Sequence, residues 1–399
     1  MFLRQSYFIG RLDTVNAGTP EMEIHPTNAV AHNTSFRQRK YMFYKNETDA
    51  YGAFPYGDAV LVDDTTSITT ITNDFSYSFY LRGKGVFKNQ AKLDLGFQND
   101  LIWYGDSLSN EFYQNSMVKG TLGYQFSDKI DIQANVNQIV VGRNAGDFLY
   151  EANAAIDISD FAGKITLGAY SQNKSPEMAY ERMNYTYHQW NSTWEKTKIQ
   201  NLSFGYSNKK IGFNGKVEYF LMDKYMYFRE IDNPDNDELR FRQIMPAQSG
   251  SMNLLKVSVG QNFRVGRFHL DNLVVYHKTD AADILAIPEL YTWHSLYYAN
   301  ILYNVMDFRL GMDVRFNTPF TTPSYAINIG QFYNDNAGIK YSTYPIGDVW
   351  FTGNIDRVNL FVSYNFFNQF AYPKGYYTVR RYPMNDANFR FGVSWKFYD

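Results

Sequence analysis

The sequence contains no cysteine among its 399 residues, so neither a disulfide framework nor a thiolate metal site can form. It also has no run of 18 or more apolar residues, and its mean hydropathy is −0.43. A membrane protein built from helices is therefore excluded. Basic and acidic residues nearly balance, at 38 and 40, which gives a net charge of −2. Because phosphate binding needs a basic surface, we expect no nucleic acid among the partners.

Recognisable catalytic and metal-binding motifs are missing as well. The six histidines form no His-Glu-x-x-His pattern, and no Gly-x-Ser-x-Gly is present. The acidic segment 231–238 offers oxygen ligands for Ca²⁺, but it lacks the spacing and turn glycine of an EF-hand, so a solvated loop is the better interpretation. We expect no enzyme, no catalytic residues, no metal and no cofactor. A hydroxyl nucleophile assembled only by folding is the alternative.

Aromatic residues, in contrast, are abundant. They make up 18% of the chain, with 34 tyrosines and 32 phenylalanines. A chain that is polar on average yet rich in aromatic residues is typical of a transmembrane β-barrel. In such a barrel apolar side chains face lipid, polar side chains face the lumen, and aromatic girdles mark both membrane surfaces. On composition alone, a soluble β-sandwich rich in tyrosine is the alternative.

The periodicity of the strands separates these two alternatives. From Phe308 to Asn317, apolar residues alternate with charged, polar or glycine residues, so one face of the strand would be apolar and the other polar. Segments 130–140, 148–158 and 389–397 alternate in the same way. Such runs reach about 10 to 12 residues, the length that a tilted barrel strand needs to cross a bilayer. Soluble strands average about 5 to 6 residues, so the pattern favours the transmembrane barrel.

The alternation of tight turns with longer connections sets the strand count. We predict a single all-β domain, a transmembrane antiparallel β-barrel of sixteen strands with short periplasmic turns and long extracellular loops; 14 to 18 strands are the alternatives. The predicted strands are 29–45, 67–83, 88–103, 113–126, 129–142, 147–158, 163–173, 188–207, 210–228, 250–264, 267–279, 290–304, 306–317, 346–356, 358–369 and 387–398.

Two further segments look like strands but would disturb this alternation. Tyr325–Tyr333 would place a long loop in the periplasm, so we assign it to the extracellular loop 318–345, as a hairpin or a fold into the lumen. Leu3–Gly10 would make the strand count odd. Residues 1–28 are therefore expected to form a periplasmic or lumenal segment, and residues 29–399 the barrel.

Inward-facing charged residues are the candidates for the lumen wall. Sixteen strands enclose a lumen wide enough for water, and charges of both signs on its wall would orient dipolar solutes. The pore-lining candidates are Lys92, Asp94, Lys119, Asp131, Glu151, Asp157, Lys164, Lys216, Glu218, Lys256, Arg309, Asp313, Arg315, Arg390 and Lys396. Arg309, Asp313 and Arg315 carry most weight, because successive inward positions on one strand lie about 7 Å apart. The alternative is that the charges only pair or solvate the interior of a plugged barrel.

Short motifs along the chain resemble those of the putative porins of Bacteroidota-type outer membranes. They are the opening Phe2–Gly10, Gly146–Phe148, His188–Asn191, Ile287–Leu290, Leu310–Val314 and the closing Gly392–Phe397. They lie in order along nearly the whole chain, so the resemblance implies a β-barrel in the bacterial outer membrane; it implies transport less firmly and supplies no catalytic or ligand residues. An outer-membrane protein needs a signal peptide. Because Met1–Gln5 does not begin one, we interpret the chain as processed, truncated or renumbered.

The expected function is a porin-like channel for passive diffusion of small hydrophilic solutes, embedded in outer-membrane lipid and needing no cofactor or energy input. The alternative is a structural or accessory β-barrel subunit of a larger outer-membrane complex, in secretion or nutrient uptake, with a blocked lumen. Other outer-membrane proteins, or further copies of the chain in a homo-oligomer, are the expected protein partners.

Overall fold

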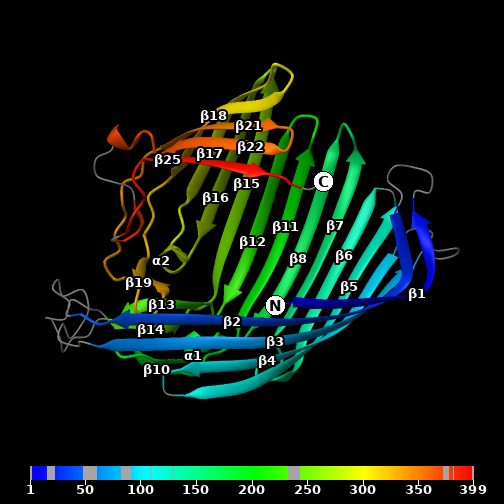
Figure 1. Cartoon of the computed structure of the whole chain (residues 1–399). Helices are drawn as coiled ribbons and strands as arrows, with labels where there is room; N and C mark the ends of the chain where they lie inside the picture. Colours follow the sequence, from blue (N-terminus) through cyan, green and yellow to red (C-terminus); the bar gives the residue numbers. More distant parts are fainter. Residues whose placement is uncertain are drawn as a thin grey trace.

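The computed structural model describes residues 2–15, 23–47, 61–81, 91–107, 109–127, 129–231, 243–371, 377–380 and 382–397. Most of them belong to one antiparallel sheet of 17 strands that curls around a central space (Figure 1). Each strand pairs with the one before and the one after it in the following order. The strands are β1 (Phe2–Val15), β2 (Glu23–Lys45), β3 (Val62–Leu81), β4 (Ala91–Asp106), β5 (Asn110–Ser127), β6 (Ile130–Gly142), β7 (Phe148–Ser159), β8 (Gly163–Lys174), β11 (Thr197–Asn208), β12 (Phe213–Asp223), β15 (Met252–Val265), β16 (Phe268–Thr279), β17 (Leu290–Leu302), β18 (Met306–Asn317), β21 (Ile346–Ile355), β22 (Val358–Asn365) and β25 (Asn388–Trp395).

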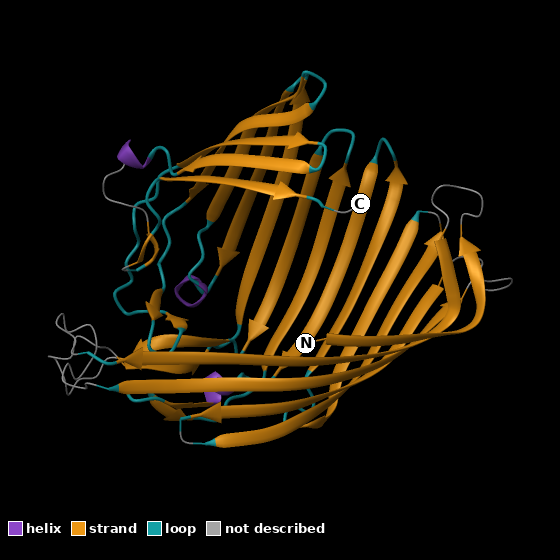
Figure 2. Cartoon of the chain, viewed as in Figure 1, coloured by secondary structure: helices purple, strands orange, loops and turns teal. Residues whose placement is uncertain are grey.

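Short elements outside this sheet lie in the longer connections between its strands (Figure 2). They are α1 (Met178–Glu181), β9 (Arg182–Asn184), β10 (Gln189–Asn191), β13 (Met226–Ile231), β14 (Gln243–Gln248), α2 (Ala282–Leu285), β19 (Ser324–Ala326), β20 (Gln331–Tyr333), η1 (Gln369–Ala371), β23 (Tyr377–Val379) and β24 (Tyr382–Pro383). None of the helices within the described ranges is long and apolar enough to cross a membrane.

The two faces of the large sheet differ in polarity, as the alternation predicts. In β18, Phe308, Leu310 and Met312 share one face, while Arg309 and Asp313 share the other. The pairing register carries this division from strand to strand across the sheet. On the apolar face large side chains are open to the surroundings, and Leu310 is 51% exposed. Because a broad exposed apolar face is unfavourable in water, this face is suited to contact with lipid.

Contacts from the long connections identify the polar face as the inner face. Tyr41 of β2 and Thr66 of β3 both belong to the polar face. The Tyr41 hydroxyl donates a hydrogen bond to the carbonyl of Ile327, and the Tyr185 hydroxyl donates one of 2.7 Å to the Thr66 hydroxyl. Ile327 and Tyr185 lie in connections that leave the sheet at β18 and at β8, far from β2 and β3. These connections must therefore cross the space that the sheet encloses (Figure 1).

The two ends of the wall carry different connections. At one end, here called the short-turn end, turns of a few residues join β7 to β8, β11 to β12, β15 to β16, β17 to β18 and β21 to β22, where we expected them. The opposite end, the long-loop end, carries longer connections that include all the short helices and hairpins (Figure 2). From β7 to β25 short and long connections alternate along the chain, as in barrels that cross the membrane once with each strand. The β4–β5 connection at the long-loop end departs from this pattern, because only three residues separate Asp106 from Asn110, where residues 104–112 were expected to form a longer connection.

The strand count differs from the expected sixteen. Phe2–Val15 forms β1 and pairs with β2 along its length, although residues 1–28 were expected outside the wall. The wall therefore has 17 strands, and in the part of the chain that the structure describes no pairing joins β1 to the other edge strand, β25. Leu3, Tyr7 and Ile9 share one face of β1, and Leu3–Gly10 already looked like a strand in the sequence. Only the even-count rule for closed bacterial barrels argued against it.

Two predicted strands are shorter in the wall than expected. The predicted strand 188–207 enters the sheet only at Thr197, because Gln189–Asn191 pairs with β9 in a separate hairpin. The predicted strand 210–228 leaves the sheet after β12. There Lys224 has a φ of 56°, and this left-handed residue turns the chain into the β13–β14 hairpin. Both segments therefore lengthen connections at the long-loop end, the first between β8 and β11 and the second between β12 and β15.

Candidate functional site: the lumen wall and the loop cap

The register places the predicted pore-lining residues on the inner face. Every candidate from Lys92 to Arg390 occupies an inner-face position of its strand. Lys396 follows the end of β25, and its backbone N–H donates a hydrogen bond of 3.0 Å to the carbonyl of Arg357. A position on the inner face is necessary for a lumen-lining role, and contact with solute stays a prediction.

Several of these charges are paired along the wall. Glu218 of β12 lies between two lysines, with its carboxylate 2.6 Å from Nζ of Lys216 and 3.4 Å from Nζ of Lys256. The Glu218 side chain is only 14% exposed, so the ion pairs are partly shielded from water. The three residues together therefore present one excess positive charge to the lumen.

Cross-strand pairing also brings in an acidic residue that the sequence analysis did not select. Lys119 of β5 lies 2.6 Å from the carboxylate of Asp74 of β3, and Lys92 lies 2.8 Å from Asp94 on its own strand. Asp74 belongs to a polar face rich in serine and threonine, where a single carboxylate gave no distinct signal. Its partner is fixed by the register across β3, β4 and β5, which periodicity alone does not determine.

The three residues Arg309, Asp313 and Arg315 have separate roles on the wall. Arg315 is paired, with Nη2 2.6 Å from the carboxylate of Asp348 on β21. Asp313 accepts a hydrogen bond of 2.7 Å from the indole N–H of Trp350. Arg309 is exposed on the inner face. The sequence analysis selected neither Asp348 nor Trp350, because β18 and β21 are separated by residues 318–345 and their register cannot be derived from periodicity.

Replacing Asp348 with Asn should destabilise the wall, because it removes the negative partner of a partly buried guanidinium group. The Asp348 side chain is 14% exposed, and we expect the free energy of unfolding to fall by roughly 2 kcal/mol. The control is Asp157→Asn, whose pair with Lys164 spans 3.6 Å with the Asp157 side chain 51% exposed. Asp157→Asn should lower the free energy of unfolding by less than about 1 kcal/mol. Urea unfolding in detergent, followed by tryptophan fluorescence, measures both, and equal losses would contradict the prediction.

The longest connections gather at the long-loop end into a packed unit, here called the loop cap (residues 175–196, 224–231, 243–251 and 318–345). Its hydrophobic core consists of the buried residues Met183, Tyr185, Trp190, Phe228, Ile244, Ala326 and Ile329. These residues come from the β8–β11, β12–β15 and β18–β21 connections. Because apolar burial favours association of the three connections, the loop cap behaves as one body instead of three independent loops.

One hairpin of the loop cap was anticipated from the sequence. Tyr325–Tyr333 was predicted to form a hairpin or to fold into the lumen, and its two ends pair as β19 and β20. After β20, Asn334 exchanges two backbone hydrogen bonds of 2.9 Å with β13. At the hairpin tip, Gly330 has a φ of 66°, and a Cβ there would lie 2.7 Å from the ring of Tyr41 on β2. The tip is therefore held against the inner face of the opposite wall.

Polar contacts fasten the loop cap to the strands around it. Arg182 lies 3.3 Å from the carboxylates of Asp106, at the end of β4, and Glu111, at the start of β5. The backbone N–H of Thr186 donates a hydrogen bond of 2.9 Å to Asp64 of β3. Together with the contact at Tyr41, these bonds attach the loop cap to strands on one side of the mouth, while its own connections leave from the other side.

Two ionisable groups in the loop cap have shifted pKa values. Burial lowers the pKa of His188 to about 4, and its side chain lies in the buried part of the loop cap. Burial alone would raise the pKa of Asp335, but hydrogen bonds from Ser324 and Arg380 and the positive charge of Arg380 outweigh it and lower this pKa. The Arg380 pair has an N–O distance of 2.9 Å. Docking of the loop cap therefore depends on protonation.

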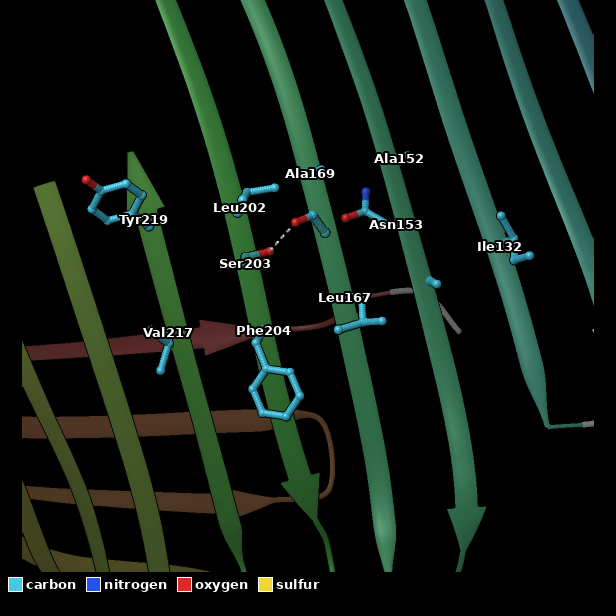
Figure 3. Close-up of a pocket in the computed structure, with 12 residues that line it drawn as sticks. Ile132, Ala152, Asn153, Leu167, Ala169, Leu202, Ser203, Phe204, Val217 and Tyr219 are labelled. Carbon is cyan, nitrogen blue, oxygen red and sulfur yellow. Dashed lines mark hydrogen bonds between the residues drawn. The ribbon is translucent and has the colours of Figure 1, made fainter. Parts of the chain in front are cut away.

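A groove of about 600 Å³ lies on the other face of the sheet, over β6 to β12 (Figure 3). Ala152 and Ala169 line it, together with the larger side chains of Leu202, Phe204 and Tyr219. These side chains occupy outer-face positions of the register. The groove is therefore suited to contact with lipid and does not belong to the lumen.

No group of three or more potential ligand residues is placed to bind a metal ion within the described part of the chain. Most of the acidic segment considered for Ca²⁺, at 231–238, lies outside the described residues. The chemistry that the described site supports is therefore that of a charged, hydrogen-bonding inner surface with a loop cap across its mouth.

Comparison with known proteins identifies the family. The family model described as "Putative porin" matches residues 1–399. The chain belongs to the putative porin family. The resemblance found in the sequence is thereby confirmed over the whole chain, whereas no curated protein matches this porin family member.

Solved structures with a similar fold are outer-membrane receptors and transporters. The copper transporter OprC has a TM-score of 0.64 at 10% identity, covering 92% of this chain and 62% of its own. The siderophore receptor PirA from Acinetobacter baumannii has a TM-score of 0.59 at 10% identity, covering 86% and 56%. The ferric enterobactin receptor PfeA from Pseudomonas aeruginosa, as a double mutant, has a TM-score of 0.58 at 10% identity, covering 85% and 53%. This porin family member thus spans somewhat more than half the length of these structures, and the likeness shows the β-barrel fold.

Proposed function

We propose that the chain forms the wall of an outer-membrane channel for passive diffusion of small hydrophilic solutes. The observation that carries this proposal is the division of the sheet into an apolar outer face and a charged inner face. Lipid stabilises the outer face, and the charges on the inner face are stable only in contact with water or with each other. Membership of the putative porin family supports the same conclusion.

The channel would act by its geometry and charge. Lysines, arginines and carboxylates offer hydrogen bonds to a passing solute, and those that pair along the wall would bind a single ion less strongly because their charges partly offset one another. Passive diffusion needs no nucleotide, cofactor or catalytic residue, so we propose that the protein is not an enzyme. Its surroundings would be outer-membrane lipid, with the long-loop end facing outward, and neighbours in the membrane would be other outer-membrane proteins or further copies of the chain.

Single-channel recording in a planar lipid bilayer tests the proposal. We expect stepwise currents that grow with salt concentration. Arg309→Glu reverses an exposed charge on the inner face, so it should lower the ratio of anion to cation permeability several-fold. The control Lys198→Glu makes the same change at an exposed position on the outer face of β11 and should leave this ratio unchanged. Equal shifts in the two variants would contradict a lumen lined by Arg309.

A second candidate function is an accessory subunit of a larger outer-membrane complex. The loop cap favours it, because its packed core lies across the mouth and joins strands from both sides. Such a barrel would serve as an anchor, and its loops would contact a partner. Persistent absence of current from correctly folded protein, together with stoichiometric partners retained in mild detergent, would favour this function over the channel.

A further inference from the structure

Two aromatic side chains on the inner face lie close over glycines of the neighbouring strands. The indole of Trp350 on β21 covers Gly311 of β18, and a Cβ at Gly311 would lie 2.6 Å from Cζ2 of that indole. The ring of Phe361 on β22 covers Gly392 of β25 so closely that a Cβ there would overlap it. The absence of a side chain at each glycine lets the ring approach the backbone of the neighbouring strand closely. The two rings are here called the aromatic platforms.

The two platforms are neighbours on the wall. Phe361 is directly opposite Thr352 in the register, and Trp350 is two residues from Thr352 on the same strand and face. Diagonal neighbours of this kind are separated by about 7 to 8 Å. Phe361 is 47% exposed, and Trp350 is half-buried because Tyr297 packs beside it with ring centroids 5.8 Å apart. Both platforms are accessible from the enclosed space.

Polar groups of both signs surround the platforms. Asp313 accepts a hydrogen bond of 2.7 Å from the indole N–H of Trp350, and its carboxylate can accept further hydrogen bonds. Arg309 is opposite Thr352, and Arg390 is opposite Ser363, the residue paired with Trp350. Both arginines are exposed on the inner face. Hydrogen-bond donors and acceptors of both signs thus lie around the two aromatic rings.

We propose that these platforms form a binding site for neutral carbohydrates on the lumen wall, with Trp350 and Phe361 as stacking surfaces. A pyranose ring has an apolar C–H face, which packs on an aromatic ring, and a rim of hydroxyl groups, which pair with carboxylates and guanidinium groups. A polyhydroxylated ligand can pair with both kinds of group, because each hydroxyl can donate and accept a hydrogen bond. This inference rests on the proposed channel function, because it names the class of solute that the wall would select.

Saturation-transfer NMR with maltotriose and the folded full chain in detergent tests the site without requiring current. We expect transfer to the C–H protons of the sugar, and none to a polyethylene glycol of equal mass, which lacks a ring. The double variant Trp350→Ala/Phe361→Ala should weaken binding at least about tenfold, the loss expected for removing stacking partners. Gly392→Ala, which displaces the ring of Phe361 but keeps it, should also weaken binding. Phe391→Ala, on the outer face of β25, should leave it unchanged.

The same variants in planar bilayers separate this inference from the channel proposal. Current that maltotriose blocks in the native protein, and fails to block in Trp350→Ala/Phe361→Ala, supports both. Stable current with no sugar binding in either assay overturns the carbohydrate site and leaves the channel standing. Sugar binding by NMR from a barrel that never conducts supports the site and overturns the channel. Binding that survives loss of both platforms overturns the assignment of Trp350 and Phe361.

Discussion

Deleting residues 324–333 and closing the gap with two glycines should raise single-channel conductance several-fold. The deleted hairpin contributes Ala326 and Ile329 to the core of the loop cap, and its tip contacts Tyr41 on the opposite wall. Removing it takes away the segment that reaches across the mouth, and it also weakens burial of the other cap residues. The wider opening should increase the flux of ions and of uncharged solutes alike.

The control for this deletion keeps the hairpin and removes only its anchor. Tyr41→Phe eliminates the hydroxyl that donates to Ile327 while keeping the ring against Gly330. It should cause brief openings and little change in the mean conductance, because one hydrogen bond contributes only about 1 kcal/mol. Migration of the folded band in an unheated gel confirms that each variant still forms its barrel. An unchanged conductance after the full deletion would show that the hairpin does not obstruct the pore.

Acidification from pH 7 to pH 4 should open the loop cap through His188. Burial lowers the pKa of His188 to about 4, whereas an undocked histidine has its ordinary value of 6.5. Between these two values the undocked loop cap binds a proton that the docked one does not, so docking weakens as the pH falls. The stability that neutral, buried His188 gives to the docked loop cap is therefore complete above pH 6.5 and lost by about pH 4. The free energy of docking changes by roughly 3 kcal/mol over this range.

The open probability in planar bilayers, recorded at fixed salt across this pH range, measures the effect. We expect the open probability of the native channel to rise below pH 6.5, and that of His188→Phe, which stays neutral and apolar, to keep its pH 7 value over the same range. Asp335 does not interfere with this measurement. Because its pKa is lowered, its protonation weakens docking of the loop cap only when the pH falls below the ordinary aspartate pKa of 3.8. Identical pH profiles in the native and His188→Phe proteins would rule out this histidine as the titrating group.

The strands of the wall were predictable because alternation is a local property. In β18 the inner and outer residues follow directly from the order of Phe308, Arg309, Leu310 and their neighbours. The tight turns at the short-turn end were predictable for the same reason, since each joins two periodic segments. β1 also looked like a strand in the sequence, although Phe2 and Phe8 fall on the same face as its polar Arg4 and Ser6. The prediction for residues 1–28 failed because it gave more weight to an even strand count than to that signal.

Cross-strand partners were not predictable, because they depend on register. Lys119 and Arg315 were selected as inward charges, and nothing in their own segments points to Asp74 or Asp348 as partners. A shift of two residues between strands would preserve every face assignment and change every pair. The platform of Trp350 over Gly311 has the same origin, since it joins residues on two strands separated by a long connection.

The loop cap was the least predictable part. Its core draws on three connections that are far apart in the sequence, and each of them contributes only two or three of the buried residues. The sequence by itself determined an antiparallel β-barrel wall with an apolar outer face and a charged inner face, because apolar and polar residues alternate along each strand and this alternation can be seen in consecutive residues. Only the tertiary structure decided which charges meet, where the aromatic platforms lie and what crosses the mouth, because these depend on contacts between segments that the chain brings together by folding.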